Sequence, residues 1–380
     1  LLHRTYIKGI LEGSITVSVG TPDEEQLEDL CSHLADLCIA SPAVCLLRSF
    51  LNHFTFSEEI LSSVYNVASA FITLYNKPES IAIVRLTTEA KEYYKAIIEY
   101  CLGGNIQAML DEYVYLLHHC DNYINHAELA NHFADILSLR TSNVEVDDYK
   151  SFRASAVERD TSRKRTTLRT HYAMDFGSQK LTSAGSGRLI NMRQAFNSPF
   201  RPFVLATTSI GQEGLDFHLY CRKIFHWNLP SNPIDFEQRE GRIHRYKGHV
   251  IRLNLASKYG SQVKAEGLNI WEKIFQLAAV EKMAAKVQCD LIPFWHINHG
   301  TSALNIERYV PIYPFSKDIE KLKNLIKVLT YYRLTFGQPR QEDLVESLSA
   351  IGFDSKEIAM LDDLMMNLSP MQFYQIEESD

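Results

Sequence analysis

The residues best suited to chemistry lie in the segment EQREGRIHRYKG, which covers positions 237–248. Arg242 and Arg245 carry planar, permanently charged guanidinium groups that suit the binding of phosphate. We expect a helix here, on which positions three apart share one face, so both groups could reach one phosphate. Gln238 falls on that face one turn earlier, where its amide could orient a water. Gly241 would let the backbone approach a ligand closely.

A second polar segment, TTSIGQEGLD at 207–216, precedes the arginines in the chain. Its small polar residues offer hydroxyls and backbone amides that suit a nucleic-acid phosphate. Its two glycines permit the tight backbone conformations of a turn beside a ligand. Asp216 could accept from a ribose hydroxyl or couple to the arginines. The candidate residues of the turn are Thr207, Thr208, Ser209, Gly211, Gln212, Gly214 and Asp216.

Two apolar runs are expected to position these residues. FVLAT at 203–207 and KIFHWNLP at 223–230 have the composition of buried parallel strands. The polar turn 207–216 would then lie at the carboxyl ends of strands, where open α/β sheets gather their ligands. Simpler interpretations remain open. An arginine-rich helix is often a solvated face, the threonines can be ordinary strand ends, and Asp216 can be a turn cap.

The two segments resemble motifs V and VI of superfamily 2 helicases and translocases, in particular the Swi/Snf-like and DISARM-type bacterial branches. Motif VI corresponds to Gln238, Gly241, Arg242 and Arg245, and motif V to the turn 207–216. The resemblance implies an α/β fold, the second RecA-like lobe, with a parallel sheet flanked by helices. It also implies that Arg242 and Arg245 act as arginine fingers at an ATP site, with Gln238 beside them. Gly214, Asp216 and Gly241 would then contact nucleotide, and 207–212 would contact a nucleic-acid strand.

Other parts of an ATPase of this class are missing from the sequence. No GxxxxGK[ST] loop or acidic magnesium box occurs in it. The chain begins with LLHR, so we expect a piece of a longer protein whose first helicase lobe binds ATP with Mg²⁺. We expect this chain alone to bind no cofactor and not to hydrolyse ATP. The segment 306–348 also resembles the C-terminal part of large bacterial helicase-related proteins.

Helical patterns flank the expected lobe. Residues 1–142 are predicted to be mainly helical, 143–256 to form the RecA-like lobe, and 257–380 to be a helical extension. Helices are expected at 23–37, 60–74 and 89–101, with a GGN stop before another helix at 106–120, and later at 262–287, 316–336 and 341–348. Within the lobe, strands are expected at 143–149, 171–177 and 250–256, and a helix at 188–197. We expect Tyr113 and Tyr115 in the helical core.

Composition narrows the class of protein. The 380 residues are 46% hydrophobic, which excludes a disordered chain, and the net charge of −7 argues against a dedicated basic nucleic-acid-binding domain. The basic stretch 153–169 could follow a phosphate backbone or form a flexible charged loop. We expect no membrane segment and a cytoplasmic location, because no apolar run approaches the length of a membrane span.

Cysteine and histidine usage indicates neither disulfides nor a metal. The seven cysteines are odd in number and scattered, and Cys31, Cys38 and Cys45 are expected to stack on one helix face. A second group contains histidines and one cysteine, whose spacing fits no zinc finger, so we expect no metal there. Its members are His118, His119, Cys120, His126 and His132.

The leading hypothesis is the C-terminal lobe of a bacterial DNA helicase or translocase that closes on an ATP-bearing first lobe. The resemblance alone implies a role in defence against foreign DNA. The alternative is a non-catalytic docking or nucleic-acid-binding module derived from such a lobe. A self-contained hydrolase using His226 or His244 has no Ser or Cys nucleophile motif to support it. DNA or RNA, strand number and oligomeric state stay open.

Overall fold

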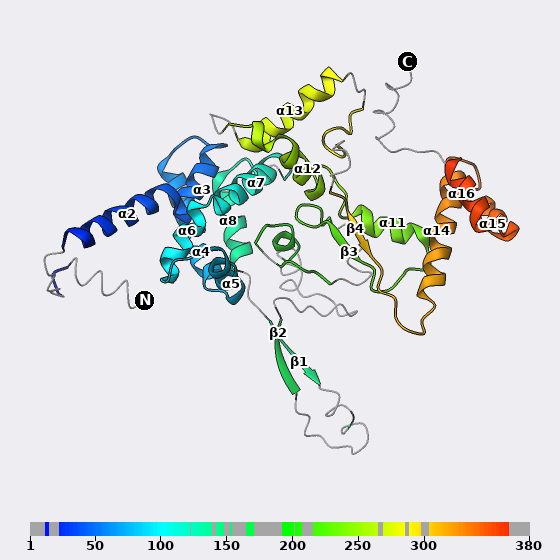
Figure 1. Cartoon of the computed structure of the whole chain (residues 1–380), viewed down its shortest axis with the longest axis horizontal. Coiled ribbons are helices and arrows are strands. Elements are labelled where there is room, and N and C mark those ends of the chain that lie inside the picture. Colours follow the sequence, from blue (N-terminus) through cyan, green and yellow to red (C-terminus); the bar gives the residue numbers. More distant parts are fainter. Residues whose placement is uncertain are drawn as a thin grey trace.

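The computed structural model describes residues 12–14, 23–121, 123–138, 142–147, 153, 165–170, 192–200, 202–206, 216–264, 269–285, 289–297 and 304–364. Figure 1 shows the N-terminal helices on one side of the view and the C-terminal helices on the other, with short strands and helices α11 (Pro233–Gly241) and α12 (His249–Tyr259) between them. A hairpin of two strands projects from the middle of the molecule (Figure 1).

The N-terminal helices form where apolar periodicity and capping residues predict them. Their N-caps include Asp23, Ser41, Ser57 and Asn125, whose side chains each accept a hydrogen bond from a backbone N–H in the first turn. The helices are α2 Glu24–Ala40, α3 Pro42–Leu51, α4 Glu58–Tyr75, α5 Pro78–Thr87, α6 Tyr93–Leu102, α7 Asn105–His119 and α8 His126–Leu137. The expected helices in this region are therefore confirmed, with α3, α5 and α8 added.

The glycine stop between α6 and α7 is also confirmed. Gly104 has φ of 80°, a left-handed conformation that favours glycine, and α7 begins at the next residue. Tyr113 and Tyr115 on α7 are 1% and 2% exposed, so they belong to the core as expected. A large apolar cluster, which includes Phe50, Phe71 and Phe133, joins α3, α4, α7 and α8.

Two expectations about α2 and α3 need correction. The expectation that no apolar run approaches the length of a membrane span is wrong, because the segment Glu24–Leu51 has the length and hydropathy of one. That criterion assigns no membrane location, because core helices also meet it, and extended Ser41 separates α2 from α3. The same break separates the cysteines: Cys31 and Cys38 are exposed on α2, whereas Cys45 is buried on α3. All seven cysteines are free.

Two small sheets occur among the described residues. Strand β1 (Ser142–Asp147) pairs antiparallel with β2 (Arg165–Thr170), and β3 (Lys223–Phe225) pairs parallel with β4 (Glu307–Tyr309). The strand expected at 143–149 is confirmed, but it belongs to the projecting hairpin and not to a parallel sheet. Part of the basic stretch 153–169 is strand β2, so the flexible-loop alternative is wrong for Arg165–Thr170.

Both strands expected to carry the candidate turn differ from expectation. β3 covers three residues of the run 223–230, and Phe225 is 64% exposed, because β4 is its one neighbour in the described part of the sheet. Residues 203–206 form no strand, and Val204 is 84% exposed. They line an apolar cavity of about 530 Å³ together with residues of α4, α5 and α7. The strand expected at 171–177 lies outside the described residues.

The closing strand expected at 250–256 is wrong, because this segment is helical. It belongs to α12 (His249–Tyr259), which is followed by the short helix η2 (Gly260–Gln262). Ile251, Leu255 and Tyr259 are buried at intervals of four, which is a helical period. A short apolar run such as 250–256 fits a strand or a helix, and burial of Ile251, Leu255 and Tyr259 against distant elements selects the helix. The helix expected at 188–197 is present at 192–196.

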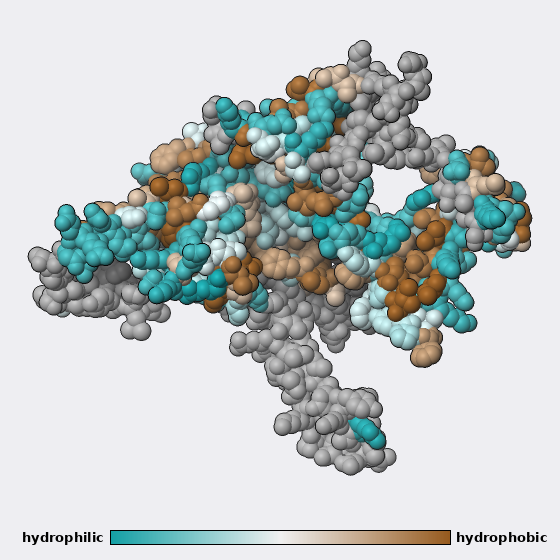
Figure 2. All heavy atoms as spheres, in the orientation of Figure 1, coloured by the Kyte–Doolittle hydropathy of each residue, from teal (hydrophilic) through white to brown (hydrophobic). Residues whose placement is uncertain are grey.

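The remaining helices agree with expectation in type, except that α16 was not expected. They are α11 Pro233–Gly241, α13 Ile270–Ala284, α14 Asp318–Leu334, α15 Gln341–Ile351 and α16 Ser355–Asp363. α14 packs against α11 through Phe236, Leu229 and Leu325. In Figure 2, apolar side chains gather on the surface around α14. The C-terminal extension thus contacts the helix that carries Gln238.

The helical region and the expected lobe share their cores. Phe200, from the segment before the candidate turn, packs into the cluster of α3–α8. A second cluster joins Tyr115 and Leu116 of α7 to Leu255 of α12 and Phe275 of α13. The side chains of the helical region 1–142 and of the expected lobe 143–256 are therefore buried against one another.

Candidate active site

Three residues selected from the sequence lie together in the structure. Arg245 Nε donates to Asp216 Oδ1 over 3.1 Å, and Arg242 Nη1 lies 4.0 Å from the same oxygen. The Asp216 carbonyl accepts from Asn197 Nδ2 over 2.7 Å, which holds this residue in place. The side chains of Arg242 and Asp216 are 20% and 37% exposed, so a ligand can reach them. Two guanidinium groups face one carboxylate, so one net positive charge is left to attract an anionic ligand.

The arginines come together through turns, and not through a shared helical face. α11 ends at Gly241, so Arg242 is its C-cap and Arg245 lies beyond it. The expectation of one helix through both arginines is wrong, because glycine is a poor helix former. The amide of Gly248 donates to the Arg245 carbonyl over 2.9 Å, which closes the following turn. A Cβ at Gly248 would lie 3.0 Å from that carbonyl oxygen, so this turn favours glycine.

Backbone hydrogen bonds fasten the arginine turn to the segment that carries Asp216. The amide of Phe217 donates to the Arg242 carbonyl, and the amide of His249 donates to the His218 carbonyl, each over 2.8 Å. Ile243, between the two arginines, is 5% exposed and packs against Phe217. The arginines and Asp216 are thus positioned by buried neighbours and by main-chain bonds.

Two features of the arginine turn are not explained by contacts within the described chain. Arg242 Nε is buried and has no hydrogen-bond partner among the described residues. Buried donors are usually paired, so a partner is expected for this N–H. No other part of the described chain lies within 4 Å of a Cβ placed on Gly241. Packing within the described chain therefore does not explain glycine at this position, whereas close approach of a ligand would.

This region is similar to a known protein family. Residues 182–247 match the helicase conserved C-terminal domain. The match supports the C-terminal lobe of a superfamily 1 or 2 helicase, and a RecA-like fold to which the small parallel sheet β3–β4 conforms. No curated protein and no solved structure matches the chain.

The other candidate residues of the helicase lobe have different positions. Gln238 is exposed on α11, one turn before the arginines. Arg239 Nη1 donates to the Asn228 carbonyl over 2.9 Å, and His244 Nε2 lies 3.1 Å from the Trp295 carbonyl oxygen. The remaining candidates of the turn lie outside the described residues: Thr207, Thr208, Ser209, Gly211, Gln212 and Gly214.

A polar network anchors the last turn of α11. The Glu240 carboxylate accepts from Arg308 Nη2 over 2.6 Å and lies 3.2 Å from His226 Nε2. Burial acts to raise the pKa of Glu240, but the hydrogen bonds with His226 and Arg308 outweigh it and lower the pKa to about 2. His226 is 2% exposed and stacks on Phe236 at 4.3 Å, so substrate cannot reach it as a catalytic base.

Lys247 links the arginine turn of the helicase lobe to α7. Its Nζ donates to the Tyr115 hydroxyl over 2.8 Å and lies 4.7 Å from the centres of the Tyr115 and Phe275 rings. Its backbone has φ of 51°, and its amide donates to the Phe294 carbonyl over 2.8 Å. Burial lowers the pKa of Lys247, and the surrounding rings provide cation–π stabilisation.

Arg252 of α12 forms a second buried link to α7. Its side chain has no exposed surface, and its Nε donates to Glu112 Oε1 over 2.6 Å. Nη1 donates to the Lys247 carbonyl over 2.6 Å, and Nη2 donates to the Leu219 carbonyl. The Arg252 guanidinium therefore connects the helical region, the arginine turn and the segment between Asp216 and β3.

The charged groups at the site are the two arginines and Asp216. Burial lowers the pKa of both His218 and His249 to about 4, so these imidazoles are neutral at pH 7. His218 and His249 lie in the two segments that are joined beside Asp216, and neither imidazole adds a positive charge to that of the arginines. An anionic ligand would therefore meet guanidinium groups at this surface.

Sequence reasoning missed Lys247, Arg252, Glu112 and Arg308. One signal was available for Arg252, because an arginine within the apolar run VIRLNLA is buried only if it is paired. Arg308 had no such signal, since its partner Glu240 is 68 positions away in the chain.

The histidines named from the sequence do not gather into one group. His132 lies 2.9 Å from the Tyr113 hydroxyl, and His126 lies 3.0 Å from the Ser63 hydroxyl. His118 and His119 instead meet His53, from a turn more than 60 positions earlier. The sequence analysis expected no metal at the group of His118, His119, Cys120, His126 and His132. The fold separates His126 and His132 from His118 and His119.

Proposed function

We propose that this chain supplies the C-terminal lobe of an ATP-dependent nucleic-acid helicase or translocase of superfamily 2. Arg242 and Arg245 act as arginine fingers at an ATP·Mg²⁺ site that a first lobe, absent from this chain, completes. Guanidinium groups stabilise the charge that phosphoryl transfer spreads over the γ-phosphate oxygens. The chain itself then binds no cofactor alone, and Gly214, Asp216 and Gly241 lie on the nucleotide side.

The observation that carries this proposal is the convergence of both guanidinium groups on Asp216 Oδ1, at 3.1 and 4.0 Å. Asp216 engages Arg245 through Nε, which leaves the Arg245 terminal nitrogens available for phosphate oxygens. Asp216 therefore positions the fingers before the nucleotide arrives, and Gln238 orients a water or bridges to the first lobe.

The second part of the proposal concerns nucleic acid. Thr207, Thr208, Ser209, Gly211 and Gln212 contact the phosphates of one DNA or RNA strand, since hydroxyls and backbone amides suit such contacts. The resemblance of motifs V and VI leads us to propose a Swi/Snf-like, DISARM-type bacterial origin and a role in defence against foreign DNA. A cytoplasmic location would suit that role. Closing and opening of the two lobes would move the protein along the strand.

The test is nucleic-acid-stimulated ATP hydrolysis by this chain joined to its ATP-binding first lobe. Arg242→Ala and Arg245→Ala are each expected to lower kcat by roughly 10³-fold, the scale of an arginine finger. Gly241→Ala is expected to preserve folding, since space for a Cβ exists, and to reduce kcat by blocking the approach of phosphate.

Arg333→Ala is the control, because Arg333 forms an exposed ion pair with Glu237 on α11, away from Asp216. Its ATPase activity should match that of the unaltered protein. Near-normal turnover in both finger variants, with circular dichroism showing intact folding, would rule out the finger assignment. If those variants also kept nucleic-acid binding and partner binding, the non-catalytic docking module would be the better description.

A further inference from the structure

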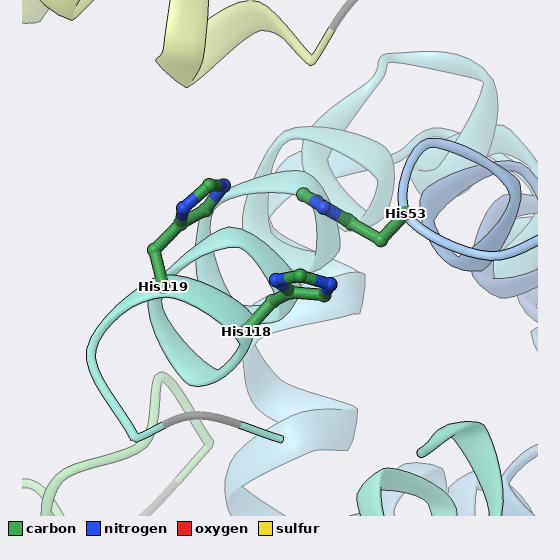
Figure 3. A group of neighbouring side chains, drawn as sticks. All are labelled: His53, His118 and His119. Atoms are coloured by element: carbon green, nitrogen blue, oxygen red, sulfur yellow. The ribbon is translucent and has the colours of Figure 1, made fainter. Parts of the chain in front are cut away.

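Three imidazoles from distant parts of the sequence converge near the end of α7. Figure 3 shows His118 and His119 at the end of this helix, with His53 facing them from a separate segment. One nitrogen of each ring lies within 4.8 Å of the others. The rings of His53 and His118 stack with centres 4.7 Å apart, and His119 lies 5.2 Å from His118.

The backbones that carry these rings are anchored in the hydrophobic core. The amide of His53 donates to the carbonyl of Phe50 over 2.9 Å, and Phe50 is fully buried. At the end of α7, the amide of Cys120 donates to the carbonyl of Leu116 over 2.8 Å, and Leu116 is also fully buried. Side-chain rotation is therefore the main adjustment that a ligand would require.

A buried residue outside the group orients His53. Asn269, which is 2% exposed, has its Nδ2 3.1 Å from His53 Nε2, and its Oδ1 accepts from the amide of Trp271. Ligating histidines usually donate the N–H of their second ring nitrogen to an acceptor. Asn269 Nδ2 is instead a donor to His53 Nε2, so coordination of a metal by either nitrogen of His53 would break this hydrogen bond.

The donor set suits a borderline transition-metal ion. Imidazole nitrogen binds Zn²⁺, Cu²⁺ and Ni²⁺, and three histidines with one open position form a tetrahedral zinc arrangement. We propose that His53, His118 and His119 form a binding site for one divalent transition-metal ion, with Zn²⁺ the best match and an open fourth position for water. The side chain of His119 is exposed, which provides an entry path.

The local charges oppose each other at this site. Lys247 disfavours a cation, whereas the Glu272 carboxylate and the negative end of the α7 dipole favour one. Zn²⁺ would lie about 2.0–2.1 Å from each imidazole nitrogen, and we expect these three bonds to outweigh repulsion by the Lys247 ammonium.

The position of the site connects it to the arginine turn. α7 also carries Glu112 and Tyr115, which bind Arg252 and Lys247. An ion shared between α7 and the turn after α3 would hold α7 against the rest of the helical region. It would thereby stabilise the scaffold of the arginine turn, without contact with Asp216.

The test is Zn²⁺ binding by the full chain after removal of metal with a chelator, with Co²⁺ as the spectroscopic probe. We expect one ion per chain and a Co²⁺ spectrum of tetrahedral nitrogen and oxygen ligation. His119→Gln is the first variant, because this exposed side chain can be replaced without loss of folding. It and His53→Gln should weaken Zn²⁺ binding by about 10-fold or more.

Two matched variants sharpen the test. His126→Gln alters a neighbouring histidine that binds Ser63 instead, and it should leave Zn²⁺ affinity unchanged. Asn269→Asp keeps an N-cap and supplies a carboxylate beside His53, so it should tighten binding. Unchanged affinity in the His53 and His119 variants overturns the proposal. A thiolate band in the Co²⁺ spectrum that Cys120→Ser abolishes would also overturn it, by assigning the ion to cysteine.

Discussion

At the residue scale, one carboxylate and two guanidinium groups define the candidate active site. Asp216 holds Arg245 directly and has Arg242 within 4.0 Å, and both arginines were identifiable from their spacing in EQREGRIHRYKG. The residue that holds this region together, Arg252, was hidden in an apolar run. Its guanidinium is fully buried and binds Glu112 together with two backbone carbonyls.

Removal of Arg252 should therefore be costly. Arg252→Met leaves the Glu112 carboxylate and two buried carbonyls without their donor, and it should lower the free energy of unfolding by about 3 kcal/mol. Adding Glu112→Gln should restore part of the loss, because the unpaired charge disappears. Urea denaturation gives both values.

Lys258→Met is the control. Lys258 is on the same helix but in a partly exposed pair with Glu281, so this variant should change the free energy of unfolding by about 1 kcal/mol or less. Equal losses in the Arg252 and Lys258 variants would contradict this assignment.

At the element scale, α11 presents the arginine turn and is held at its end by Glu240. The carboxylate joins α11 to Arg308 of β4 and to His226 after β3. β4 comes from the segment 306–348, for which the resemblance implied no chemistry. Its contribution is to complete a small parallel sheet beside α11 and to fix the helix that precedes Arg242.

The Glu240 network should give a defined pH dependence. Its folded-state pKa of about 2 lies below the ordinary value of 4.5, so its stabilisation is present above pH 4.5 and is lost as the pH falls towards 2. Glu240→Gln should lower the free energy of unfolding by on the order of 2 kcal/mol at pH 7. The difference from the unaltered protein should shrink between pH 4.5 and 3 in urea titrations. A difference that is constant over this range would show that the charge of Glu240 does not stabilise the fold.

At the scale of the whole molecule, the helical region and the helicase lobe share buried contacts. Tyr115 and Leu116 of α7 lie in one cluster with α12 and α13, and Phe200 packs among the N-terminal helices. The links from Lys247 to Tyr115 and from Arg252 to Glu112 reinforce this contact. The helices around the site therefore act as its support, and not as a separate attachment.

Because the helical region and the helicase lobe share buried contacts, we expect them to unfold in a single transition. Far-UV circular dichroism reports mainly on the helices, and tryptophan fluorescence reports on Trp271 in the shared cluster, together with Trp227 and Trp295. The two signals should give coincident urea transitions, and Arg252→Met should shift both equally. Separate midpoints for the two probes would indicate that the helical region unfolds independently of the lobe.

The sequence by itself determined the local features of this protein. Helix periodicity and capping residues specified most helices, and the spacing of Gln238, Gly241, Arg242 and Arg245 indicated a helicase C-terminal lobe, because these signals depend on neighbours in the chain. Only the tertiary structure decided which partners meet across long separations. It paired Arg308 with Glu240, brought His53 to His118 and His119, and made 250–256 a helix against α7 and α13. Short apolar runs fit a strand and a helix equally well, and burial against distant elements selects between them.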